Sequence, residues 1–81
     1  MNEFAEVCVT LQMQNDFESA ETCFTITMIR TYANALRAEL LKPSSNLIGK
    51  TILDQVTTMA SANAALMGYE LTSVATASIL D

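Results

Sequence analysis

Apolar side chains recur along much of the chain at the three- and four-residue spacing of a helix. Phe4, Val7, Cys8 and Leu11 follow this spacing, which predicts a first helix over residues 3–14. The polar pair that comes next, Asn-Asp, is typical of a break between two elements.

The next segment, residues 16–42, also has a mainly helical pattern, and an aspartate or a serine near its start can cap it. The residues near one face of this second predicted helix are Phe17, Ala20, Phe24, Met28, Ala35 and Leu36. Residues 24–28 also alternate between apolar and polar side chains and are rich in β-branched residues, so a strand is the competing interpretation. We favour a helix, because residues 32–41 are plainly helical in pattern and no turn signal precedes them.

The only proline, Pro43, ends the second predicted helix, because proline disfavours helical geometry in the residue before it. Ser44 or Ser45 then caps a third helix. The buried stripe expected on this helix contains Ile48, Ile52, Val56, Met59 and Leu66, with Asn63 on the same side. Gly68 terminates or kinks it, and residues 71–79 form a short fourth helix or a continuation.

These elements predict a single all-α domain over residues 1–81, a small hairpin or bundle of three to four helices. Apolar residues make up 51% of the sequence, and a chain this short buries only roughly 60% of its unfolded surface. We therefore expect a homo-oligomer, with its seam at Ala62, Asn63 and Leu66. Small residues there let helices approach closely, and the buried amide either fixes their register or is presented to a ligand or a second copy.

All four basic residues lie between positions 30 and 50 of a chain whose net charge is −5. The acidic balance argues against binding to a nucleic-acid polymer or to an anionic membrane. The basic cluster has two interpretations. Arg37 and Lys42 complement the C-terminal dipole of a helix, or the cluster forms a local site for one or two phosphates.

The remaining chemistry is sparse. Cys8 and Cys23 have apolar sequence neighbours and are predicted to be reduced core thiols; a disulfide is the alternative and would imply an oxidising compartment. The chain has no histidine and no Cys-x-x-Cys motif, so we expect no zinc site and no Cys–His or Ser–His nucleophile. No window reaches the ~18 apolar residues of a membrane span. Glu3 and Glu6 make the N-terminus unlike a signal peptide, which leaves the cytoplasm as the expected compartment.

One stretch of the chain resembles a known family. Pro43-x-Ser45, followed by Ala-Asn-Ala-Ala-Leu at residues 62–66, resembles the C-terminal half of the bacteriophage anti-CBASS sponge proteins. The family pattern is roughly Pro-x-Ser-Arg-Glu and then a helix that ends in Trp-Ala-Asn-Ala-Ala-Ile, at the same offset. The resemblance covers about residues 24–66, and the family's arginine is Asn46 in this chain.

The resemblance implies a compact helical homo-oligomer, typically a hexamer, in the cytoplasm of a bacterial host. Such proteins bind cyclic di- or trinucleotide messengers between protomers and sequester them without cleavage, which needs no cofactor. The ligand-binding residues would be Tyr32, Arg37, Lys42, Ser45, Asn46 and Lys50.

The alternative is a self-assembling structural or adaptor subunit without a small ligand. The helix–Lys-Pro-Ser-Ser-Asn–helix hairpin also resembles that of type III secretion needle subunits. An enzyme is not expected, because carboxylates such as Glu39 and Asp54 have no partner at a spacing that would tune a general acid.

Overall fold

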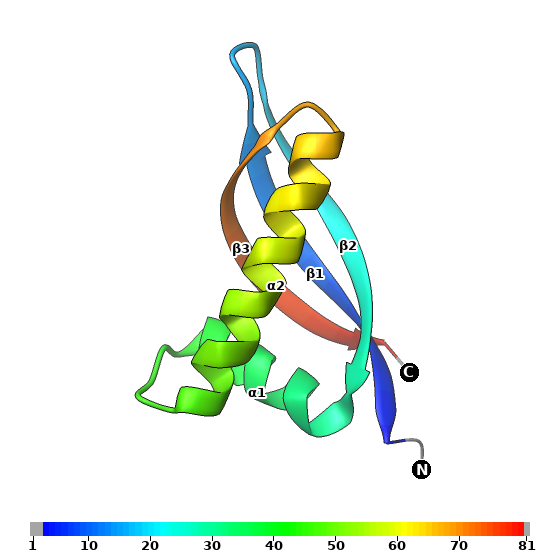
Figure 1. The fold of residues 1–81 in the computed structure, drawn as a ribbon, viewed down its shortest axis with the longest axis vertical. Helices are drawn as coiled ribbons and strands as arrows, with labels where there is room; N and C mark the ends of the chain where they lie inside the picture. Colours follow the sequence, from blue (N-terminus) through cyan, green and yellow to red (C-terminus); the bar gives the residue numbers. More distant parts are fainter. Residues whose placement is uncertain (1–2, 81) are drawn as a thin grey trace.

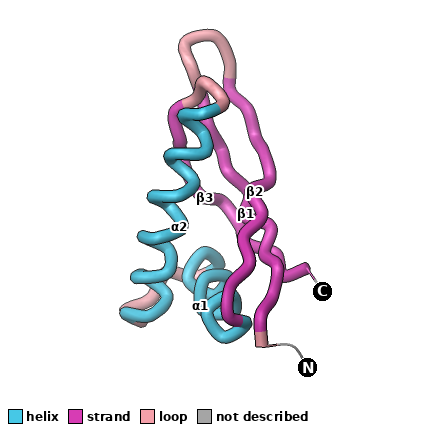
Figure 2. The backbone as a smooth tube through the Cα atoms, turned by 45° about the vertical axis from the view of Figure 1, so that its right-hand side comes forward, coloured by secondary structure: helices cyan, strands magenta, loops and turns pink. Residues whose placement is uncertain are grey.

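Within residues 3–80, three strands and two helices make up the fold. In chain order they are β1 (Phe4–Gln14), β2 (Ser19–Ile29), α1 (Arg30–Leu41), α2 (Leu47–Leu66) and β3 (Glu70–Leu80). The structure is a computed structural model and describes residues 3–80. The strands form one antiparallel sheet in the order β2-β1-β3, so that β1 is the central strand. Both helices lie on one face of this sheet (Figures 1 and 2).

The all-α prediction is wrong. The N-terminal and C-terminal parts of the chain form an antiparallel sheet, so the fold is α+β. The segment predicted as a first helix, residues 3–14, is β1, and residues 71–79 belong to β3. The strand interpretation of residues 24–28 is the one observed, and that strand extends over all of β2. The helical pattern of residues 32–41 is confirmed in α1.

The alternation of buried and exposed residues in β1 explains why this segment is a strand. Its odd-numbered residues are buried against the helices, and these are Ala5, Val7, Val9, Leu11 and Met13. Its even-numbered residues lie on the open face of the sheet, where most of them are polar. Alternation with a period of two is the pattern of a strand in a sheet that has one face covered. The helical spacing of Phe4, Val7, Cys8 and Leu11 describes only some of the apolar residues in this segment.

A tight turn built on Asn15 joins β1 to β2. The Asn15 side-chain oxygen accepts hydrogen bonds from the backbone N–H groups of Phe17 and Glu18, each at 2.9 Å. The Asn15 backbone N–H in turn donates to the Glu18 carbonyl at 3.0 Å. Asparagine favours such turns because its side chain can hydrogen-bond backbone groups two and three residues later.

Gly68 ends α2, as its position in the sequence predicts. Its φ is +84°, in the left-handed region that glycine adopts without strain. The Tyr69 N–H donates to the Ala64 carbonyl at 2.9 Å and the Gly68 N–H to the Ala65 carbonyl at 3.1 Å, the pattern of a Schellman motif. The chain then turns back along β1 as β3, whose pairing contains two register shifts.

The core lies between the sheet and the two helices. It contains Val7, Val9, Leu11, Ala33, Leu36, Val56, Ala60 and Ala77. The fully buried residues of α2 are Gly49, Val56, Ala60 and Ala64, mostly small residues that let the helix pack closely. The buried stripe predicted for α2 is therefore wrong: the helix is turned about its axis so that a different side faces the core, and Val56 is the only fully buried residue of the predicted stripe.

Candidate functional site

The turn between α1 and α2 is built around the carboxylate of Glu39. This side chain is only 6% exposed. It accepts hydrogen bonds from the Ser44 backbone N–H, 3.3 Å from each carboxylate oxygen, and from the Ser44 hydroxyl at 3.1 Å. One of the N–H groups that could have faced an anionic ligand is therefore already paired with the chain's own carboxylate.

The start of α2 is capped by Asn46. The Asn46 side-chain oxygen accepts a hydrogen bond from the Ile48 N–H at 3.0 Å. Ser44 acts one step earlier, because its hydroxyl accepts a hydrogen bond from the Asn46 N–H at 3.1 Å. The prediction that Ser44 or Ser45 caps this helix is wrong by one or two residues, since asparagine satisfies the same donors.

The six residues predicted to bind a ligand are all exposed, and only one of them lines the hollow beside the first half of α2. Tyr32 lines a hollow of about 350 Å³ between α1 and the first half of α2. Its other lining residues are Leu47, Ile48, Thr51, Ile52 and Gln55, which make the hollow largely apolar. None of the remaining predicted residues, Arg37, Lys42, Ser45, Asn46 and Lys50, contributes to its lining.

The outward side of α2 carries several large apolar residues that are exposed. We define the outer stripe of α2 as Ile48, Gln55, Met59, Ala62 and Leu66. Their spacings of seven, four, three and four residues place them on one side of a helix. Leu66 is 88% exposed, Ile48 57% and Met59 44%.

The residues predicted to form the oligomer seam belong to this outward side or border it. Ala62 and Leu66 are exposed members of the outer stripe, whereas Asn63 is half-buried at its border. The structure thus brings two of the three seam residues together on an open surface. The sequence did not reveal Ile48 and Met59 as members of that surface, because the helix was expected to bury its large apolar residues.

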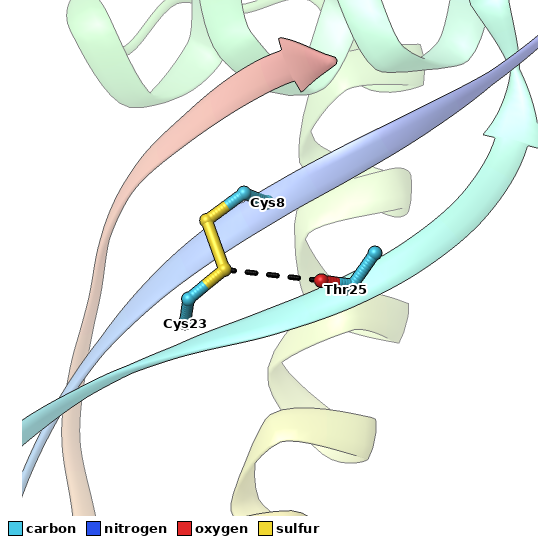
Figure 3. The surroundings of a disulfide bond; sticks show 3 residues. All are labelled: Cys8, Cys23 and Thr25. Carbon is cyan, nitrogen blue, oxygen red and sulfur yellow. Dashed lines mark hydrogen bonds between the residues drawn. A yellow bond between two sulfur atoms is a disulfide. The ribbon is translucent and has the colours of Figure 1, made fainter.

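The two cysteines lie on the opposite, open face of the sheet and form a disulfide (Figure 3). Cys8 is paired with Thr25 in the sheet and Cys23 with Thr10, so the cysteines are diagonal neighbours with a Cα–Cα distance of 5.7 Å. The Thr25 hydroxyl oxygen lies 3.8 Å from the Cys23 sulfur. The prediction of two reduced core thiols is wrong, because their apolar sequence neighbours point to the other face of the sheet.

A third group of contacts ties the β1–β2 turn to the loop after α2. The Tyr69 hydroxyl donates a hydrogen bond to the Glu18 carboxylate, and the Asn15 side-chain amide donates to the Gly68 carbonyl at 3.3 Å. The hydrogen bond to Glu18 raises the pKa of the Tyr69 hydroxyl, with smaller contributions from desolvation and from the negative charge of Glu18. These contacts hold one end of the molecule together and leave Phe17 exposed at the tip.

Within residues 3–80, no cluster of three or more His, Cys, Asp or Glu side chains is arranged to hold a metal ion. Neither of the two helices in that part of the chain is long and apolar enough to cross a membrane. Comparison of the chain with protein-family models, curated proteins and solved structures gave no match. The cyclic-nucleotide sponge function therefore stays a prediction.

Proposed function

We propose that the protein is a non-catalytic structural subunit that assembles with copies of itself through the outer stripe of α2. The observation that carries this proposal is the exposure of Ile48, Met59 and Leu66 along one side of a helix whose other side is packed. Fully burying a side chain of this size contributes about 1.5–3 kcal/mol. Several such residues on each of two copies supply enough free energy for a specific association.

The chemistry of α2 favours a second copy as the occupant of this surface. The exposed Ser61, Ala62 and Ala65 are small, so the backbone of another helix can approach closely along the second half of α2. The outer stripe has no charged member, because Lys50 and Asp54, the only charged residues of α2, lie outside it. Although the whole chain has a net charge of −5, this face presents no net charge to repel its own copy.

The alternative of a messenger-binding sponge has less support from the geometry. The basic side chains that were expected to meet phosphates do not line the hollow at Tyr32. The lining of that hollow is largely apolar, which does not suit a ligand that carries two or three phosphates. The helical architecture implied by the family resemblance is also not the one observed.

Sedimentation velocity over a wide range of protein concentration tests the proposal. The wild type is expected to form oligomers whose share increases with concentration, and Leu66→Ser is expected to weaken their formation. Leu41→Ser is the matched control, because Leu41 is 75% exposed but belongs to α1. A wild type that stays monomeric throughout, or equal effects of the two substitutions, would overturn the proposal.

A further inference from the structure

Within the described residues 3–80, no strand pairs with the outer edge of β2, so the backbone groups directed to that edge are open for another strand. At the two ends of the β1–β2 pairing, the Asn15 N–H donates to the Glu18 carbonyl at 3.0 Å and the Arg30 N–H to the Glu3 carbonyl at 2.7 Å. Because hydrogen-bonded and non-hydrogen-bonded pairs alternate in an antiparallel ladder, the even-numbered residues of β2 direct their backbone groups to β1. The odd-numbered residues, from Ser19 to Ile29, direct theirs to the open edge.

Several features that usually protect an edge strand are missing from β2. It contains no proline, glycine, lysine or arginine, and Glu21 is its only charged residue. Its register with β1 is continuous over all of its residues, whereas the other edge strand, β3, is interrupted by two register shifts. In Figure 1, β2 runs along one side of the sheet over most of its length, and α2 lies on the face of the sheet and not along that edge. An edge of this kind is a template for another strand.

The side chains of β2 that face the helices are also incompletely covered. The inward residues of β1 are all buried, but those of β2 are only half-buried, and these are Ala20, Thr22, Phe24, Ile26 and Met28. Phe24, Ile26 and Met28 pack against the margin of the core. The open backbone edge and the partly covered apolar row thus lie on the same strand. A strand added at this edge would form hydrogen bonds with the open backbone groups and would cover the partly exposed apolar side chains.

We infer that β2 pairs antiparallel with β2 of a second copy, with a two-fold axis at Phe24, so that two three-stranded sheets become one continuous sheet. In this register Cys23 lies opposite Thr25 of the second copy, and Glu21 opposite Thr27. All of these residues direct their backbone groups to the open edge, so their pairs are hydrogen-bonded ones. Phe24 lies opposite its own copy at a non-hydrogen-bonded position, where facing side chains are closest.

Strand length selects this register among its neighbours. Phe24 is the middle residue of β2, so pairing about Phe24 matches the two strands along their whole length. A register centred on Cys23 or on Thr25 leaves two residues at one end of each strand without a partner.

This interface goes beyond the proposed function, because it uses a surface separate from the outer stripe of α2. Each interface is two-fold, with the same patch contributed by both copies. Two different two-fold interfaces on one subunit do not close on each other unless their axes intersect suitably; in general they build an open chain of alternating contacts. The protein is then the repeating unit of a filament in which sheet-to-sheet and helix-to-helix contacts alternate.

Substitution of Thr25 by proline tests the edge pairing. The Thr25 N–H points to the open edge, so Thr25→Pro removes a donor needed for pairing while β1 keeps all its bonds; proline is tolerated at such edge positions. Thr25→Ser is the matched control, since it keeps the N–H. In sedimentation velocity, Thr25→Pro and Leu66→Ser should each stop assembly at a dimer, and the double variant should be monomeric. Far-ultraviolet circular dichroism and thermal unfolding establish that each variant is folded.

The results separate the two proposals. If Leu66→Ser is monomeric at every concentration while the wild type dimerises, the edge pairing is wrong and the function of α2 stands. If Thr25→Pro alone is monomeric, assembly runs through β2 and the role of α2 is wrong. Assembly of folded Thr25→Pro beyond a dimer also overturns the edge pairing.

The register has its own test, in the Leu66→Ser background where only the edge interface remains. Thr27→Lys should tighten the dimer about threefold to tenfold, because the introduced ammonium group faces Glu21 of the second copy at two symmetric places. Glu21→Gln should cancel this gain. The same ammonium group also faces Glu6 within its own sheet, but that contact acts on folding and does not depend on Glu21. A gain that survives Glu21→Gln contradicts the register centred on Phe24.

Discussion

The carboxylate of Glu39 accepts hydrogen bonds from both the backbone N–H and the hydroxyl group of Ser44. One acidic side chain from the last turns of α1 therefore fixes the course of the chain into α2. Because Glu39 is nearly inaccessible to solvent, water cannot replace it readily when it is removed.

We expect Glu39→Ala to lower the free energy of unfolding by about 1–3 kcal/mol, because it leaves the partly buried Ser44 N–H without an acceptor. Glu39→Gln keeps an acceptor oxygen of the same shape and should cost clearly less. Urea unfolding followed by circular dichroism measures both. Equal losses for the two variants would show that the carboxylate charge, and not hydrogen bonding to Ser44, is what matters.

The Cys8–Cys23 disulfide should stabilise the fold by restricting the unfolded chain. The two cysteines are separated by 15 residues, for which the chain-entropy model gives about 3 kcal/mol. We expect the double variant Cys8→Ser/Cys23→Ser to lose roughly this much free energy of unfolding and still to assemble. Alkylation in denaturant without a reductant provides the direct check, by mass spectrometry. Two modified thiols in freshly isolated protein would show that the bond does not form.

The disulfide also connects to the expected compartment. Disulfides persist in oxidising surroundings and are rare in the cytosol, so the alkylation experiment also tests the cytoplasmic expectation drawn from the sequence.

The Tyr69 hydroxyl should titrate above the ordinary tyrosine pKa of about 10, because its hydrogen bond to Glu18 favours the protonated form. The folded-state pKa is raised, so this contact stabilises the fold fully below about pH 10 and its contribution is lost as the pH rises through the raised pKa. Ultraviolet titration of a Tyr32→Phe variant follows Tyr69 alone, since the chain has two tyrosines. Glu18→Gln should lower the measured pKa toward its ordinary value.

The two glycines should respond differently to alanine. Gly68→Ala meets no atom within 4 Å but forces a side chain into a positive φ, which costs about 1–2 kcal/mol. Gly49→Ala has an ordinary φ, but its added carbon would lie 3.2 Å from the Cβ of Glu39 and 3.3 Å from the Ala35 carbonyl oxygen. Thermal unfolding measures both losses. Only Gly49→Ala should also alter the α1–α2 turn, seen as faster amide hydrogen exchange of Ser44.

Local signals in the sequence identified the helical half of the fold. The helical pattern of residues 32–41, the stop at Pro43 and the terminating Gly68 all agree with the structure. Each of these features depends on backbone geometry or on hydrogen bonds within a few residues. No long-range information is needed to predict them.

The strands were missed because their patterns are ambiguous without a partner. In β1, Phe4, Val7, Cys8 and Leu11 match helical spacing by coincidence, while the complete alternation becomes decisive only when β2 and β3 pair on either side. In β3, two register shifts break the alternation that would otherwise mark a strand.

The rotation of α2 could not be predicted either. Gly49, Ala60 and Ala64 are buried because the helix packs closely against α1 and the sheet, and this depends on the distance between elements. Binary patterning assigns large apolar residues such as Leu66 to the core. The sequence placed Leu66 both in the buried stripe and in the oligomer seam, and the structure shows that Ile48, Met59 and Leu66 are all exposed.

The central position of β1 has a consequence for how a newly made chain matures. Its first neighbour, β2, follows within a short turn, but its second neighbour, β3, comes only after both helices. Contacts between such distant segments form slowly, because a long loop must close first. Until β3 pairs with β1, both edges of the β1–β2 hairpin lack a strand partner. During this interval, misassociation with other nascent molecules competes most strongly with correct folding.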